Sequence, residues 1–344
     1  MKIMRHIQFI LALIASVSAS NLFGQTSDFH LIKRTVIGGE GGWDYLSVDP
    51  KNRRLYVSHS TQVEVLNIDT HEKIGVIPNL LGVHGVIAVP KSGRGITTNG
   101  KSNTASIFDL KTLNVIVELP TGKNPDALLY DEFSKRVFIF NHSDVTATAI
   151  DIVEGKVVGT IDLGGTALEA GVTDEHGTIF VNLEDDSEIV SFDAKTLAIK
   201  NRWKITPGEE PTGLAIDTNT KRLFSVCHNG MMMVVDTEKG NAVAQIPIGQ
   251  RVDGVVFDPK LKMAFSSNGE GTVTVVQEVS ATEFKVVQTI KTEVGARTLT
   301  IDPKTHHIFV STAQYGATPE ATTENPHPRP SVVPGTFMIL EFGQ

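Results

Sequence analysis

The chain contains a single cysteine, Cys227, among its 344 residues. One cysteine cannot form an internal disulfide bond, and no CxxC pair or His-rich tract is present to indicate a zinc ribbon. The GxSxG nucleophile elbow, the P-loop and a GxGxxG run between a strand and a helix are also missing. These absences remove the familiar signatures of serine hydrolases, NTPases and dinucleotide-binding enzymes.

The sequence has fewer basic than acidic residues: 31 Lys and Arg against 39 Asp and Glu, which gives a formal net charge of −8. An acidic surface repels phosphate backbones, so we expect no nucleic-acid partner. Long apolar stripes with the helical period of 3.6 are also missing beyond the N-terminus. The sequence therefore predicts a fold with almost no helix.

The N-terminus has the pattern of an export signal. Lys2 and Arg5 precede a nearly unbroken apolar run over 7–15, and small residues follow at 16–20. The run is too short for a transmembrane helix, and no cysteine follows it to carry a lipid anchor. We therefore expect a signal peptide over 1–20 and a periplasmic or secreted protein without a membrane anchor. A buried N-terminal helix is the alternative.

Beyond residue 40, a pattern of about 40 residues recurs seven times. In each copy a short apolar strand ends at an Asp-Pro-like turn, a second strand follows a basic residue, and a third strand ends in Asp. The aligned turn positions, 40 to 44 residues apart, are Asp49, Val89, Asp131, Asp174, Asp217, Asp258 and Asp302. This period fits a four-stranded propeller blade and is longer than leucine-rich or helical repeats.

The two ends of the chain complete one another. The seventh copy has strand patterns near 298–301, 308–311 and 337–342 and then stops, one strand short. The segment 31–37 precedes the first copy and has no blade of its own, so it is predicted to supply the missing strand and to cover the open sheet edge. We thus expect one all-β domain over 28–344, a monomeric seven-bladed β-propeller of four-stranded antiparallel blades.

Several segments resemble the YVTN β-propeller repeat family over nearly the whole of residues 31–344. The clearest are DPKNRRLYVSH, IFDLKTLNV, FDAKTLAI and DPKTHHIFVST. The resemblance implies the fold, and families of this shape include binding scaffolds, lactonase-like hydrolases and virginiamycin B lyases. A secreted bacterial branch looks closer still, through WDYLSVDP, GVHG, GKNPDA and GARTLTIDPKTH. In that branch a cysteine is expected near Gly208, as the partner of the one at Cys227; here the position is glycine.

Ionisable residues recur five positions before each aligned turn. They are Asp44, His84, Asp126, Glu169, Asp253 and Arg297, with Thr212 as the exception. These positions start the innermost strands, which converge on the propeller channel, and four crowded carboxylates raise one another's pKa unless a cation compensates. We therefore predict that Asp126, Glu169 and Asp253 hold one divalent metal ion, the candidate cofactor. A water-filled channel with internally paired charges is the alternative.

The loops after the second strands lie on the same face as these positions and add His59, His142 and other polar residues. A long segment, 313–335, emerges there too, and its prolines favour an ordered wall over a floppy tail. Catalytic candidates are His84 and His142 as acid–base groups and Arg297 as an oxyanion partner. The candidate ligand-binding residues are Asp44, His59, Tyr315, His327 and Arg329.

Two functional hypotheses follow. The first is a periplasmic or secreted β-propeller that binds a small-molecule ligand, a metal or a partner protein on its channel face. The second is a metal-dependent hydrolase or lyase of the lactonase-like kind, which would use the acidic ring and the histidines of the same face.

Overall fold

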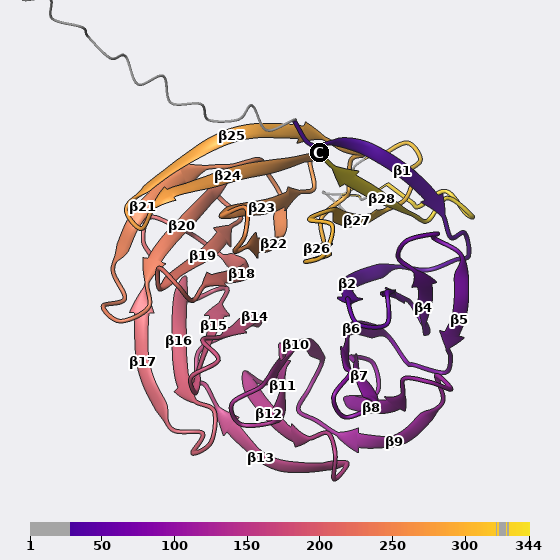
Figure 1. Ribbon diagram of the computed structural model, residues 1–344, viewed down its shortest axis with the longest axis horizontal. Helices are drawn as coiled ribbons and strands as arrows, with labels where there is room; N and C mark the ends of the chain where they lie inside the picture. The colour runs from indigo at the N-terminus through magenta and orange to yellow at the C-terminus, as the bar shows by residue number, and fades with distance from the viewer. Residues whose placement is uncertain (1–27, 321, 323–327, 329) are drawn as a thin grey trace, which may run out of the picture.

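The computed structural model describes residues 28–320, 322, 328 and 330–344, and the expected signal peptide lies outside them. These residues form 28 β-strands in seven four-stranded sheets arranged around a central axis (Figure 1). The prediction of an all-β, seven-bladed propeller is therefore confirmed. Within the described residues, no helix is long and apolar enough to cross a membrane.

The first four blades follow one another in chain order, each from the innermost to the outermost strand. Blade one comprises β2 (Trp43–Asp49), β3 (Arg54–His59), β4 (Gln62–Asn67) and β5 (Lys73–Ile77). Blade two comprises β6 (Val83–Val89), β7 (Arg94–Asn99), β8 (Thr104–Asp109) and β9 (Val115–Pro120). Blade three comprises β10 (Pro125–Asp131), β11 (Arg136–Asn141), β12 (Thr146–Asp151) and β13 (Lys156–Asp162). Blade four comprises β14 (Leu168–Thr173), β15 (Thr178–Leu183), β16 (Glu188–Asp193) and β17 (Ile199–Lys204).

The last three blades include the one that closes the ring. Blade five comprises β18 (Pro211–Asp217), β19 (Arg222–Cys227), β20 (Met231–Asp236) and β21 (Ala242–Pro247). Blade six comprises β22 (Val252–Asp258), β23 (Met263–Asn268), β24 (Thr272–Ser280) and β25 (Glu283–Lys291). Blade seven comprises β26 (Leu299–Ile301), β27 (Ile308–Thr312), β28 (Met338–Gly343) and, as its outermost strand, β1 (His30–Val36).

The closure of the ring joins the two ends of the chain. β1 pairs antiparallel with β28, with Thr35 opposite Ile339 and Val36 opposite Met338. Blade one also contacts blade seven directly: Arg53 donates to Asp302, which follows β26, with Nη2 2.7 Å from Oδ2. The predicted closing strand is thus present, and it covers the edge that β28 would otherwise expose.

The recurring Asp residues form side-chain-to-backbone turns. Asp49 Oδ1 accepts hydrogen bonds from the amides of Lys51 and Asn52, at 3.1 and 3.0 Å. The same pattern follows the third strands, where the amides two and three residues on donate to Asp109, Asp151, Asp193 and Asp236. Because these bonds are local, a four-residue stretch is enough to define each turn.

The basic residue that starts several second strands links neighbouring blades. Arg94 donates to the carbonyl of Ile152 at 2.8 Å, and Arg136 donates to the carbonyl of Ala194 at 2.9 Å. Arg54 and Arg222 make the equivalent bonds to Leu110 and Ala281. Each guanidinium therefore satisfies carbonyls in the outer turn of the next blade. This is the structural reason for the basic position of the repeat.

The apolar cores lie between adjacent blades. One of them packs Phe138 and Phe140 of blade three against Ile179 and Phe192 of blade four, all fully buried. Each sheet is covered by a neighbour on both faces, so its middle strands are buried along nearly their whole length rather than at alternate residues.

Cys227 is a free, buried thiol that faces Gly208. A Cβ atom on Gly208 would lie 2.8 Å from the Cys227 Sγ and 2.5 Å from the Met233 Cγ. Burial raises the pKa of the Cys227 thiol to about 12. The position at which the resemblance implies a second cysteine is therefore in direct contact with Cys227.

We expect Gly208→Cys to form a disulfide bond with Cys227. The bond would stabilise the chain by at most about 3 kcal/mol, since it closes a short loop and Met233 has to move aside. Thiol titration in denaturant should find no free thiol after mild oxidation. Gly208→Ala is the matched control, because it adds the same crowding Cβ without a bond and should destabilise the protein. Two free thiols in oxidised Gly208→Cys would contradict the prediction.

We also expect removal of β1 to destabilise the whole propeller. A chain that begins at residue 38 loses six paired positions on β28 and the buried ring of Phe29. At about 1 kcal/mol for each backbone hydrogen bond, the lost pairing alone costs roughly 3–6 kcal/mol. Urea denaturation of this variant, compared with a chain that begins at residue 28, measures the effect. Leu31→Ser, which changes only an exposed side chain of β1, should leave the midpoint in place. An unchanged midpoint in the truncated chain would refute the closure argument.

Candidate functional site

A cavity of about 750 Å³ opens at the end of the channel where the innermost strands begin. Its acidic lining comprises Asp44, Asp126, Glu169, Glu184 and Asp253. Arg251, Arg297 and His228 add basic groups, and Trp43, Tyr45 and Tyr315 add aromatic rings. We call this space the mouth cavity. Its size lies within the range of small-molecule binding sites.

A β-bulge lies at the ring position of six of the seven blades. The pairing of the first strand with the second is irregular in blades one to six, and the irregular step always spans the ring position. Side chains from the neighbouring blade hold this backbone: Thr98 donates to the Asp126 carbonyl at 2.6 Å, and Thr298 donates to the Asp44 carbonyl at 2.8 Å. A bulge re-aims a side chain that a regular strand would direct elsewhere.

His84 lies between two ring carboxylates. Its Nδ1 atom is 2.7 Å from Asp44 Oδ2 and 3.4 Å from Asp126 Oδ1. One ligand atom from each of these three residues can be chosen so that all lie within 4.8 Å of one another. Asp126 Oδ1 is buried and accepts no hydrogen bond from any described residue.

A second group of the same kind shares Asp126. His142 Nδ1 lies 3.1 Å from Glu169 Oε1 and 3.0 Å from the carbonyl of Leu168. The ligand atoms of Asp126, His142 and Glu169 also lie within 4.8 Å of one another. The structure thus brings Asp126 and Glu169 together, as the sequence predicted, and adds three residues that the predicted metal set did not contain: Asp44, His84 and His142.

The pKa values of these groups reflect crowding. Burial, and then the charges of Asp44 and Glu169, raise the pKa of Asp126 well above its usual range, against the opposing effect of the two histidines. Burial lowers the pKa of His84, but the hydrogen bond to Asp44 and the charge of Asp126 outweigh it, so that the net shift is upward. The bond to Glu169 raises the pKa of His142 to about 9. The carboxylates beside both imidazoles therefore favour the charged form of the rings.

Asp253 lies apart from both groups and faces Arg297. The Arg297 Nε atom is 3.4 Å from Asp253 Oδ2. Burial raises the pKa of Asp253 to about 7, with Arg297 opposing the shift. Asp253 therefore neighbours a guanidinium instead of joining Asp126 and Glu169 in a cluster of ligand atoms.

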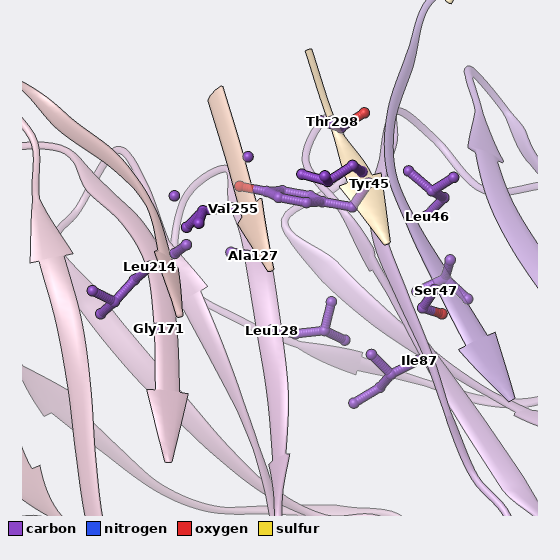
Figure 2. A pocket seen from close by; sticks show the side chains of 15 residues that line it. Tyr45, Leu46, Ser47, Ile87, Ala127, Leu128, Gly171, Leu214, Val255 and Thr298 are labelled. Carbon is purple, nitrogen blue, oxygen red and sulfur yellow. The ribbon is translucent and has the colours of Figure 1, made fainter. Parts of the chain in front are cut away.

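Tyr45 forms the floor of the mouth cavity. Its ring crosses the channel from β2 towards Val255 of β22 (Figure 2). Below it lies a second cavity of about 170 Å³ with mostly apolar walls, and Tyr45 lines both spaces. Burial, followed by the charges of the four ring carboxylates, raises the pKa of the Tyr45 hydroxyl well above its usual range. The mouth cavity is therefore closed towards the channel by a neutral phenol.

The two limbs of the segment 313–335 pair with each other and stand beside the mouth cavity. Tyr315 forms an antiparallel bridge with Val332, and the Val333 amide donates to the Gln314 carbonyl at 2.8 Å. The Tyr315 ring lies 6.2 Å from the ring of Trp43. Tyr315, Pro330 and Val332 line the cavity, while the predicted ligand-binding residues His327 and Arg329 lie outside the described residues.

His59 is packed into the protein, and the structure does not bring it to the cavity lining. Its side chain is 3% exposed, lies 3.4 Å from Glu64 and packs against Phe337, beneath Gly39. Glu184 and His228 do line the cavity, 3.5 Å from each other. Their positions directly after the second strands of two blades are the sequence feature that indicates this location. The candidate set omitted Arg251, although it immediately precedes the innermost strand β22 and therefore belongs to the same face.

Comparison with known proteins supports the fold. No protein-family model and no curated protein matches the sequence. One similar solved structure is U3-55K, with a TM-score of 0.74 and 10% sequence identity; the match covers 91% of this chain and 98% of that one. Another is a chain of the mitotic checkpoint complex, with a TM-score of 0.74 and 11% sequence identity; that match covers 99% of both chains. Identities this low show the fold alone. The chain is a seven-bladed β-propeller with histidines and carboxylates gathered at one mouth of its channel.

We expect the ring of Tyr45, rather than its hydroxyl, to stabilise the channel floor. Tyr45→Ala would join the two cavities and cost about 2–3 kcal/mol, because the surrounding apolar side chains lose contacts. Tyr45→Phe should cost less than about 1 kcal/mol, since the hydroxyl makes no hydrogen bond with a described residue. Chemical denaturation of both variants tests this. Equal losses in the two variants would show that the hydroxyl carries the role.

Proposed function

We propose that this protein is a ligand-binding propeller that holds a divalent cation at the mouth of its channel. The candidate ligands are Asp44, His84, Asp126, His142 and Glu169. The observation that carries the proposal is the position of Asp126. Its Oδ1 atom is buried without a hydrogen bond, and the residue belongs to both groups of closely spaced ligand atoms. A buried carboxylate oxygen without a donor is costly unless a cation compensates it.

The donor set favours a transition metal. Imidazole nitrogen combined with carboxylate oxygen suits Zn²⁺ and similar ions, whereas Ca²⁺ prefers oxygen ligands alone. In a tetrahedral zinc site, bonds of about 2.0 Å place neighbouring ligand atoms about 3.3 Å apart. The His84–Asp126 and His142–Glu169 separations of 3.4 and 3.1 Å are close to that value. Each group of three therefore contains one pair of ligand atoms near the spacing that such an ion needs.

Cation binding has to compete with protons. Each imidazole can coordinate a metal through Nδ1 only after that nitrogen loses its proton, and the pKa of His142 is raised to about 9. Affinity for the cation should therefore increase with pH up to that value. Without a cation, two protonated imidazoles would neutralise part of the carboxylate charge by themselves, and this internal pairing is the competing explanation.

A metal-dependent hydrolase is the second candidate function. It is favoured by the space beside the ligand cluster, because the mouth cavity is large enough for an organic substrate. A bound divalent cation would lower the pKa of a water molecule, and Arg297, which also lines this cavity, could steady a negative charge. A partner protein is the alternative ligand for this face, since one similar propeller belongs to the mitotic checkpoint complex.

We also propose that the protein works outside the cytoplasm. The support is the pattern of residues 1–20, in which two basic residues, an apolar run and small residues follow one another. The resemblance to secreted YVTN-repeat propellers supports the same location.

The test compares two aspartates of the same ring. Adding Zn²⁺ should raise the melting temperature of the parent protein, and EDTA should reverse the shift. Asp126→Asn should abolish the shift and, with EDTA present, should be slightly more stable than the parent, because it removes a repelling charge. Asp253→Asn is the matched control, since it lies at the same ring position but outside both ligand groups, and it should keep the Zn²⁺ response.

Isothermal titration of the same variants gives the stoichiometry. The parent and Asp253→Asn should bind at least one equivalent of Zn²⁺, and Asp126→Asn should bind none. If the parent shows no stoichiometric binding, or if Asp126→Asn binds as the parent does, the cation site is excluded and the two imidazoles are the internal counterions of the ring.

A further inference from the structure

We infer that the mouth cavity takes a small organic carboxylate with an apolar body, whose anionic end binds to Arg297 and Arg251. This inference rests on the proposed function, because it names the ligand class of the same site. The first reason is space. A water molecule takes up about 30 Å³ in the liquid, so a cavity of about 750 Å³ leaves most of its volume free when one hydrated cation is bound.

The second reason is the division of charge around the mouth. The two groups of candidate cation ligands come from blades one to four, at the starts of β2, β6, β10 and β14 and from the loop after β11. Arg251 and Arg297 precede β22 and β26, which lie side by side in blades six and seven, across the ring from β10 (Figure 1). The cavity lining therefore has a carboxylate side and an arginine side, and on the arginine side Asp253 neighbours Arg297.

The third reason is the state of the two arginines. Arg297 is 47% exposed, and its only ion pair among the described residues joins Nε to Asp253, which leaves both terminal nitrogens available. Its backbone is held in place, because Gly254 N and Ser267 Oγ both donate to the Arg297 carbonyl. The side chain of Arg251 forms no ion pair or hydrogen bond with a described residue, and its carbonyl accepts a bond from Gly269 N at 2.8 Å. The backbone at both arginines is thus fixed, and a planar guanidinium fork matches the two oxygens of a carboxylate.

The fourth reason is the apolar wall between the two charged sides. Tyr315, Val294 and Val332 line the cavity beside Arg297, and Tyr45 closes it below. The Gly295 backbone packs directly against the Tyr315 ring, where a Cβ would lie only 2.4 Å from a ring carbon. An aromatic or aliphatic body would bury this surface while its carboxylate meets the arginines. Repulsion from the ring carboxylates is relieved when the cation is bound, so the anion should bind more tightly with the cation present.

The test uses four carboxylates of increasing size, each with its neutral amide as a matched probe: acetate, butyrate, phenylacetate and indole-3-acetate. Binding is measured by calorimetry on the full mature chain, with Zn²⁺ and with EDTA. We expect affinity to increase with the size of the apolar body and each bound acid to exceed its amide by about tenfold or more. Arg297→Gln should remove this preference for the acid. Lys111→Gln, an exposed change at the opposite face, should not alter it.

Arg297→Lys separates a binding role from a structural one. It keeps the charge beside Asp253, and hence the fold, but loses the planar fork, so its preference for acid over amide should fall between those of the parent and Arg297→Gln. If none of the four acids binds better than its amide to the parent, the inference is overturned. It is also overturned if Arg297→Gln, with an unchanged circular dichroism spectrum, keeps the preference.

The two proposals fail separately in this design. If Zn²⁺ binds to the parent but no acid is preferred over its amide, the carboxylate inference fails and the cation site stands. If acids bind through Arg297 in EDTA and Zn²⁺ shows no binding, the cation site fails and the arginine subsite stands.

Discussion

The antiparallel pairing of β1 with β28 is the contact on which the rest of the structure depends. It joins residues about 300 positions apart in the chain and turns a row of blades into a closed ring. Closure brings blade one against blade seven, where Arg53 reaches Asp302 and Thr298 bonds the backbone of Asp44. Because the ring is closed, the innermost strands have to converge, and the side chains at their first residues have to meet.

That convergence creates an electrostatic problem at the mouth. Four carboxylates and one additional glutamate surround a space that also contains the neutral hydroxyl of Tyr45. The protein compensates unevenly. His84 pairs with Asp44, and His142 pairs with Glu169. Arg297 pairs with Asp253. Asp126 keeps one oxygen atom that accepts no hydrogen bond from a described residue. Binding of a ligand at this site would relieve that cost.

Much of the architecture could be predicted because its signals are local. Asp49 and its counterparts define turns through hydrogen bonds to amides two or three residues away. A basic residue at the start of a second strand donates directly to a carbonyl of the next blade. The convergence of the ring positions followed from the repeat as well, since equivalent positions in a propeller lie at equal distances from its axis. The neighbours of each ring residue did not follow from it. Asp253 faces Arg297, and His59 is buried beneath Gly39 instead of lining the cavity.

The sequence by itself determined the number of blades, the strands and turns within each blade, the closing strand and the register that faces the channel. These depend on periodicity and on bonds between residues close in the chain. Only the tertiary structure decided that Asp126 is shared between His84 and His142, that the ring of Tyr45 closes the channel and that Arg251 joins Arg297 at the mouth. These relations depend on which side chains the neighbouring blades bring together around the recurring bulges and on the closure of the whole ring, and no single repeat encodes either.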